Sequence, residues 1–146
     1  MNSKEVKDYL NQIRLLDRIV QNRKRQKERW LEIAKNISAS YENERVQSSG
    51  SQQRMADAVV ASIDFGNEMD AAIIQREAEK QHIISQLEKL KPDEYDVLYG
   101  LYVDFKSPDD VAEDCGKSRS WVTSMHGQAL VSLGKILDSE RNCAKL

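Results

Sequence analysis

The stretch SPDDVAEDCGKSRSWVTSMHGQALVSL, residues 107–133, decides how the C-terminal part of this chain folds. Ser107 is a favourable N-cap and Pro108 suits the first position of a helix, so a helix is predicted to begin here. Gly116 enters the left-handed conformation at no steric cost, which predicts the end of that helix and a sharp turn. Ser118 is then the predicted N-cap of a second helix.

Apolar residues recur on both sides of the predicted turn, at the spacing of two short helices that cross steeply. The residues expected between these helices are Val111, Cys115, Val122 and Met125, with Ala112 at the closest approach. The outward face of the second helix then carries small, hydroxyl or cationic side chains and no carboxylate. A helical corner without a ligand is one interpretation, and DNA binding is the one we favour. The predicted DNA-binding residues are Lys117, Ser118, Arg119, Ser120, Thr123 and Ser124.

The run VAEDCGKSRSWVTSMHGQAL resembles the promoter-reading helix-turn-helix in the fourth region of bacterial sigma factors. The shared pattern is an alanine in the first helix, a glycine turn, a serine-arginine start to the second helix, and a valine seven residues before an alanine-leucine pair. These residues are Ala112, Gly116, Ser118, Arg119, Val122, Ala129 and Leu130. With its long helical N-terminal part, the chain resembles small phage and prophage proteins that act as sigma-like or late-gene transcription regulators. The resemblance implies promoter DNA, double-stranded, as the ligand.

Composition limits the class of protein. The chain has 146 residues, of which 40% are hydrophobic and 32% are charged, and this balance is typical of a soluble helical protein. No apolar run approaches the roughly 18 residues that a membrane span needs, and the N-terminus lacks the apolar core of a signal peptide. We therefore expect no membrane contact and a cytoplasmic location, and the resemblance implies that this is the cytoplasm of a bacterial host cell. Glycine and proline are scarce and no stretch alternates like a strand, which predicts an all-α fold.

The N-terminal part has two long stretches with helical apolar spacing, and a polar segment at residues 39–53 is the loop predicted between them. We expect the two helices to pack antiparallel, as a hairpin that can also form a homodimer. The predicted division is a hairpin domain of residues 1–90 and a helix-turn-helix domain of residues 91–146. The first stripe is Val6, Tyr9, Leu10, Ile13, Leu16, Val20, Trp30, Ile33, Ala34 and Ile37. The second is Met55, Val59, Ile63, Met69, Ile73, Ile83, Leu87 and Leu90.

Two further helices complete the predicted fold. Pro92 breaks the second long helix, and residues 93–105 carry apolar side chains at helical spacing up to Phe105. Within this segment, Gly100 would let another helix approach closely. The last helix is expected to run from Ser118 to Leu137, and the tail at 139–146 is expected to fray.

A basic run within the first long helix is the second candidate binding surface. Such a run is most often a solvated helix face, and the functional alternative is contact with phosphates or with an acidic partner. Its residues are Arg23, Lys24, Arg25, Lys27 and Arg29.

No pattern in the sequence supports an enzyme. There is no glycine-rich phosphate loop and no nucleophile motif, and His126 is expected to pack rather than to act as a base. The two cysteines, Cys115 and Cys143, make no disulfide framework. With two histidines they form no metal-ligand spacing, so we expect no metal and no cofactor.

The charge of the C-terminal part qualifies the DNA-binding prediction. Residues 91–146 hold seven basic and ten acidic side chains, a net charge of −3, whereas DNA-binding modules are normally basic. We therefore expect the protein to need a second copy or bacterial RNA polymerase to stay on DNA. Two alternatives remain open. One is a small terminase subunit for phage DNA packaging, and the other is a host-directed protein-binding module or inhibitor that uses the motif only as a scaffold.

Overall fold

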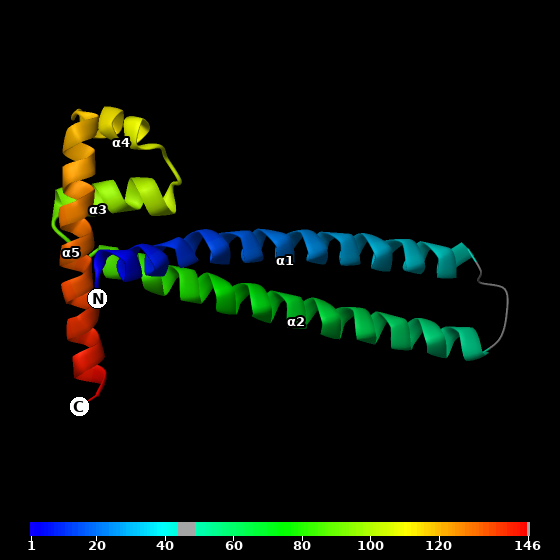
Figure 1. The fold of residues 1–146 in the computed structure, drawn as a ribbon. Helices are drawn as coiled ribbons and strands as arrows, with labels where there is room; N and C mark the ends of the chain where they lie inside the picture. Colours follow the sequence, from blue (N-terminus) through cyan, green and yellow to red (C-terminus); the bar gives the residue numbers. More distant parts are fainter. Residues whose placement is uncertain (44–48, 146) are drawn as a thin grey trace. The chain divides into compact units, whose positions relative to one another are not determined.

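A computed structural model describes residues 1–43 and 49–145, without the side chains of residues 38–43, 49–53 and 55. The described residues are helical almost throughout and contain no strand, which confirms the predicted all-α class (Figure 1). Within them, no helix is both long and apolar enough to cross a membrane. The helices are α1 (Ser3–Asn43), α2 (Ser49–Leu87), α3 (Pro92–Leu98), the π-helix η1 (Tyr99–Val103), α4 (Pro108–Cys115) and α5 (Arg119–Ala144).

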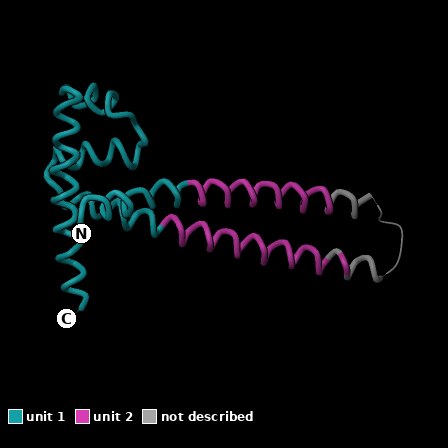
Figure 2. The backbone as a smooth tube through the Cα atoms, viewed as in Figure 1, with its two compact units in different colours: residues 1–17, 78–146 teal, residues 18–77 magenta. Residues whose placement is uncertain are grey.

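The chain forms two compact units, and both long helices contribute to each of them (Figure 2). Unit 1 is Met1–Asp17 with Ala78–Leu146, and unit 2 is Arg18–Glu77. The predicted domain boundary between residues 90 and 91 lies inside unit 1. Whether residues 1–90 and 91–146 fold independently stays a prediction.

The main core of unit 1 joins the first turns of α1 to the last turns of α2 and to α3 and α5. Leu10, Leu87 and Leu133 are each 0% exposed, so residues from three helices share one interior. The Nζ of Lys80 on α2 lies 3.3 Å from an Asp17 carboxylate oxygen on α1. The buried members of this core are Val6, Leu10, Ile13, Leu16, Ile83, Leu87, Leu98, Ala129, Leu130, Leu133 and Leu137.

In unit 2 the two helical segments run antiparallel. Lys27 of α1 forms an ion pair with Asp70 of α2, and the Trp30 indole N–H donates to the Ser62 backbone oxygen at 3.4 Å. The Trp30 and Phe65 rings also meet edge to face, with centroids 4.7 Å apart. Because a later residue of α1 meets earlier residues of α2, the predicted antiparallel packing is confirmed within this unit.

Several predicted helix boundaries are wrong. Much of the predicted loop at residues 39–53 is helical, since α1 continues to Asn43 and α2 begins at Ser49, and residues 44–48 lie outside the described residues. The stretch has no proline, its serines and asparagine only mildly disfavour a helix, and Gly50 lies in the first turn of α2. The tail at residues 139–146 was predicted to fray, but α5 continues through most of it, to Ala144. Within this part of α5, Glu140 forms an ion pair with Lys89.

The predicted apolar stripes are buried or half-buried in unit 1 but not along the whole of unit 2. Val20 is 1% exposed, as predicted, whereas Ile33 and Ile63 are 50% and 57% exposed. Ile37 and Val59 are also exposed, and Met55 lies outside the described side chains. These four exposed residues correct the prediction: helical spacing identified an apolar face, but the two helices of this unit do not cover it.

The helix predicted for residues 93–105 changes character in the middle. It runs as α3 to Leu98 and then as the π-helix η1, and Phe105 leaves it with a positive φ of 57°. Phe105 is 37% exposed and lies beyond η1, so the prediction that the helix reaches Phe105 is wrong. Gly100 lies in η1, where an added Cβ would come within 2.9 Å of a Val111 methyl group. The expected close approach at Gly100 is therefore confirmed, and its partner is α4.

We expect Gly100→Ala to lower the free energy of unfolding by about 1–3 kcal/mol, because the new methyl group would overpack against Val111. Gly127→Ala is the matched control in α5, since nothing lies within 4 Å of its added Cβ. Better helix propensity should make that control more stable, by up to about 1 kcal/mol. Urea unfolding of both variants gives the comparison. Equal stabilisation by both substitutions would show that η1 and α4 are not closely packed.

Candidate nucleic-acid interface

The first helix of the candidate site, α4, begins as the sequence predicts. Pro108 is its first residue, and the Ser107 hydroxyl oxygen accepts a hydrogen bond from the Asp110 backbone N–H at 3.2 Å. This bond satisfies one of the N–H groups that have no partner inside the helix. The start of α4 is therefore fixed by local sequence alone.

The turn between α4 and α5 is also formed as predicted. Gly116 adopts φ 65° and ψ 33°, the left-handed region that favours glycine. Its N–H donates to the Glu113 oxygen at 3.1 Å, and the Lys117 N–H donates to the Ala112 oxygen at 2.9 Å. This pair of bonds is the Schellman motif, which closes a helix and reverses the chain.

The start of α5 is capped and held against a small second core. The Ser118 hydroxyl oxygen accepts from the Trp121 N–H at 3.1 Å. Below this cap, four residues from α3, α4 and α5 are buried together, and Trp121 packs half-buried at their edge. The buried residues are Val97, Val111, Ala112 and Val122, and Leu101, Cys115 and Met125 pack against them. The predicted contacts between the two helices are thereby confirmed. Burial raises the pKa of the Cys115 thiol, as suits a packing residue.

All six predicted DNA-binding residues are exposed on one continuous stretch of the turn and the first turns of α5. Arg119 is the only arginine among them, and the Thr123 hydroxyl donates back to the Arg119 backbone oxygen at 3.1 Å. The Lys117 ammonium lies 5.7 Å from the centre of the Trp121 ring. The exposed set is Lys117, Ser118, Arg119, Ser120, Thr123 and Ser124.

Carboxylates lie closer to this face than the sequence predicts. The Arg119 Nε is 3.7 Å from an Asp109 carboxylate oxygen, and both side chains are more than two-thirds exposed. Lys106, which precedes α4, pairs with Asp114 of that helix at 2.7 Å, and this hydrogen bond raises the pKa of the lysine. The absence of carboxylates therefore holds for the first turns of α5 but not for the neighbouring helix α4.

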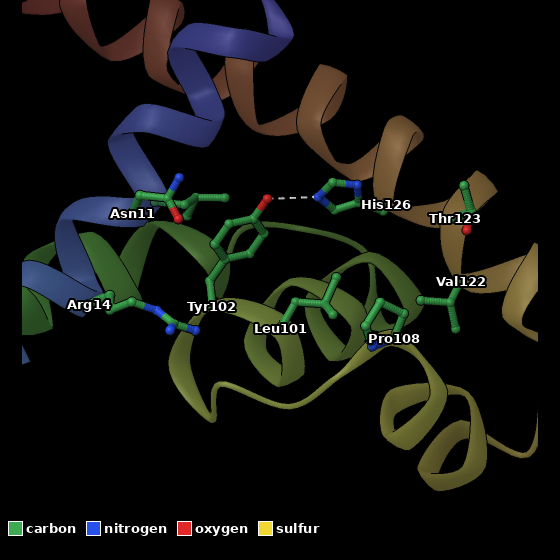
Figure 3. Close-up of a pocket in the computed structure, with 9 residues that line it drawn as sticks. Asn11, Arg14, Leu101, Tyr102, Pro108, Val122, Thr123 and His126 are labelled. Atoms are coloured by element: carbon green, nitrogen blue, oxygen red, sulfur yellow. Dashed lines mark hydrogen bonds between the residues drawn. The ribbon is translucent and has the colours of Figure 1, made fainter.

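A pocket of about 310 Å³ opens beside the candidate surface, and sequence reasoning missed it (Figure 3). Thr123 belongs both to this pocket and to the predicted DNA-binding set. The α1 side of the pocket carries Arg14, whose guanidinium carbon lies 4.7 Å from the centre of the Phe105 ring. The lining residues are Leu10, Asn11, Arg14, Leu101, Tyr102, Pro108, Val122, Thr123 and His126.

His126 has a structural partner in this pocket. Its Nε2 and the Tyr102 hydroxyl are 2.8 Å apart, and the two rings are stacked with centroids 5.8 Å apart (Figure 3). Burial lowers the pKa of His126, and the charge of Lys7 lowers it further. The lowered pKa favours the neutral imidazole, which packs between α5 and η1 as predicted.

The basic run at residues 23–29 lies in unit 2. Arg23 and Lys27 are half-buried, and Lys27 pairs with Asp70 across the two helices. Lys24, Arg25 and Arg29 are exposed. The run is thus divided between two half-buried residues, of which Lys27 contacts α2, and three residues on the solvated face.

Comparisons with protein-family models, with curated proteins and with solved structures give no match to this chain. Among the described residues there is also no group of three or more histidine, cysteine or acidic side chains that could hold a metal ion. The function must therefore be argued from the chemistry of the surfaces themselves.

Proposed function

We propose that the chain is a phage or prophage transcription regulator that binds double-stranded promoter DNA in the cytoplasm of a bacterial host. In this proposal α4 and α5 are a helix-turn-helix, and α5 is its recognition helix. One observation carries the proposal: the exposed face at the start of α5 holds only hydroxyl and cationic side chains on a turn capped at both of its ends. A rigid support of this kind is what a recognition helix needs at its N-terminal end.

The side chains on this face divide into two roles. Arg119 has the reach and the paired donors to bind the O6 and N7 atoms of a guanine in the major groove. Lys117 and the serine hydroxyls suit phosphate oxygens, which position the protein without selecting a sequence. The resemblance of residues 111–130 to a sigma-factor motif supports the same division, because it places the serine-arginine pair at the start of the recognition helix.

The electrostatics imply that this interface is weak when it acts alone. Asp109 lies beside Arg119 and competes with DNA for its guanidinium group. Exposed carboxylates at Asp110, Glu113 and Asp114 add a repulsion that falls with salt screening. We therefore propose that a second copy of the chain, or bacterial RNA polymerase, supplies additional affinity.

The proposal predicts a loss of sequence preference in Arg119→Ala. The variant should discriminate less well between a duplex selected from a random library and a scrambled duplex, by about 1–3 kcal/mol. Lys117→Ala should instead weaken binding to both duplexes alike and reduce the salt dependence by about one charge. Arg141→Ala, in the exposed last turns of the same helix, is the matched control and should leave both affinities unchanged. Fluorescence anisotropy at two salt concentrations measures all three.

Two further binding measurements complete the test, one with another variant and one with added RNA polymerase. Asp109→Asn should raise the affinity for both duplexes, since it removes the competing carboxylate from Arg119. RNA polymerase added to the wild-type chain should raise the affinity for the selected duplex. If no duplex is selected with or without polymerase, α5 does not bind DNA, and the module that binds only protein becomes the better proposal.

A further inference from the structure

Unit 2 leaves an unusual amount of apolar surface uncovered. Within the part of unit 2 whose side chains are described, Val20 and Met69 are the only buried apolar side chains. Four of the exposed ones border the same groove at matching levels of the two antiparallel segments, with Leu31 and Ile37 on α1 and Val59 and Ile63 on α2. Large contiguous apolar patches are rare on soluble monomers, and they often mark an interaction surface.

The shape of this surface suits another pair of helices. A groove of about 430 Å³ runs between the two segments, with the Trp30 indole and small residues such as Ala34, Ala58 and Ala61 in its lining. Leu31 and Ile63 also line the groove, and each is more than half exposed. Alanines let a second backbone approach closely, and the larger residues can insert into a matching groove. A surface that has both features can pair with itself through a two-fold axis.

The charges of unit 2 specify the partner more closely. Residues 18–37 of α1 carry seven basic and two acidic side chains, a net charge of +5. Residues 54–77 of α2 carry two basic and five acidic ones, a net charge of −3. A two-fold arrangement can place α1 of one copy beside α2 of the other, so that each interface joins opposite charges. The Lys27–Asp70 pair already joins the two helices in this way within one chain.

We propose that the apolar face of unit 2 binds the same face of a second copy, which forms an antiparallel four-helix bundle with α1 beside the partner copy's α2. The groove around Trp30 is covered in this dimer. Ile63 and Leu31 lie at its centre, where desolvated apolar side chains contribute most to affinity. This inference says how the second copy invoked in the proposed function would bind. It concerns unit 2 alone and is tested without DNA, so the dimer and the DNA binding can fail separately.

Sedimentation of the full chain tests the dimer. The wild type should sediment at twice the 16.7 kDa mass of one chain. Ile63→Glu should raise the dimer dissociation constant by about tenfold or more, because it places a charge in the covered surface. Ile74→Glu is the matched control, since Ile74 lies on the same helix, is 67% exposed and does not line the groove. That control should remain dimeric, and both variants should keep the wild-type helical circular dichroism.

The arrangement of the helices is tested by zero-length cross-linking in a mixture of ¹⁵N-labelled and unlabelled chains. Mixed-isotope links between lysines of α1 and carboxylates of α2 are expected. A wild-type chain that stays monomeric up to its solubility limit would overturn the proposal. So would an Ile63→Glu variant that dimerises as tightly as Ile74→Glu, or mixed-isotope links that join α1 only to α1.

Discussion

Leu10→Ala should destabilise the helices at the opposite end of the chain. Leu10 is fully buried in the core cluster that also contains Leu133 of α5, so its truncation leaves a cavity in unit 1. Truncating a buried leucine to alanine costs about 2–5 kcal/mol of the free energy of unfolding. Urea unfolding monitored by circular dichroism gives this value. Hydrogen exchange should become faster in α5 as well as in the first turns of α1, because both lose the same packing.

Leu15→Ala is the matched control for this experiment. Leu15 lies in the same helix but is 49% exposed, so its truncation should change the free energy of unfolding by less than about 1 kcal/mol. If Leu10→Ala changes exchange in α1 but not in α5, the two ends of the chain do not share a core. The boundary at residues 90 and 91 would then describe the domains better than the division into units 1 and 2.

Val20→Asp should open unit 2. Val20 is 1% exposed and is one of two buried apolar side chains among the described residues of that unit. The substitution removes the burial of a valine and forces a carboxyl group either to stay buried or to separate the helices. The expected loss is at least about 3 kcal/mol of the free energy of unfolding. Hydrogen exchange should become faster in residues 18–37 and 56–77, while α4 stays protected.

Ile74→Asp introduces the same charge into unit 2 at a side chain that is 67% exposed. We expect its thermal unfolding and its exchange pattern to match those of the wild type. Equal behaviour of the two variants would show that Val20 is not enclosed between α1 and α2, and that the stripe has been assigned to the wrong face.

Local features of the candidate site could be predicted because short stretches of sequence determine them. Ser107, Gly116 and Ser118 each act through backbone groups within a few residues. Their identity and spacing were therefore sufficient to predict the two N-caps and the turn. The apolar contacts between Val111 and Val122 followed from helical periodicity once the turn was placed. These predictions needed no knowledge of the rest of the fold.

Long-range packing could not be predicted in the same way. A periodic apolar stripe indicates that a helix face is covered, but it does not identify what covers it. The stripe of α1 therefore did not indicate that Leu10 shares a core with Leu133. It also did not indicate that Ile33 is exposed. Two further features depend on how the helices cross, which sequence spacing does not reveal. They are the pocket beside the candidate surface and the contact between Asp109 and Arg119.

Unit 1 is formed by two segments that are far apart in the sequence, and this constrains the order in which the chain can fold during synthesis. In unit 1, Met1 pairs with Asp138 across a sequence separation of 137 residues, whereas Trp30 and Ser62 in unit 2 are separated by 32. A ribosome delivers the N-terminal residues first, and long-range contacts close more slowly than local ones. The helices of unit 2 can therefore pair while α5 is still being made. The first turns of α1 can meet Ile83 and Leu87 of α2 at an early stage, but their core is complete only when Leu130 and Leu133 of α5 have been made.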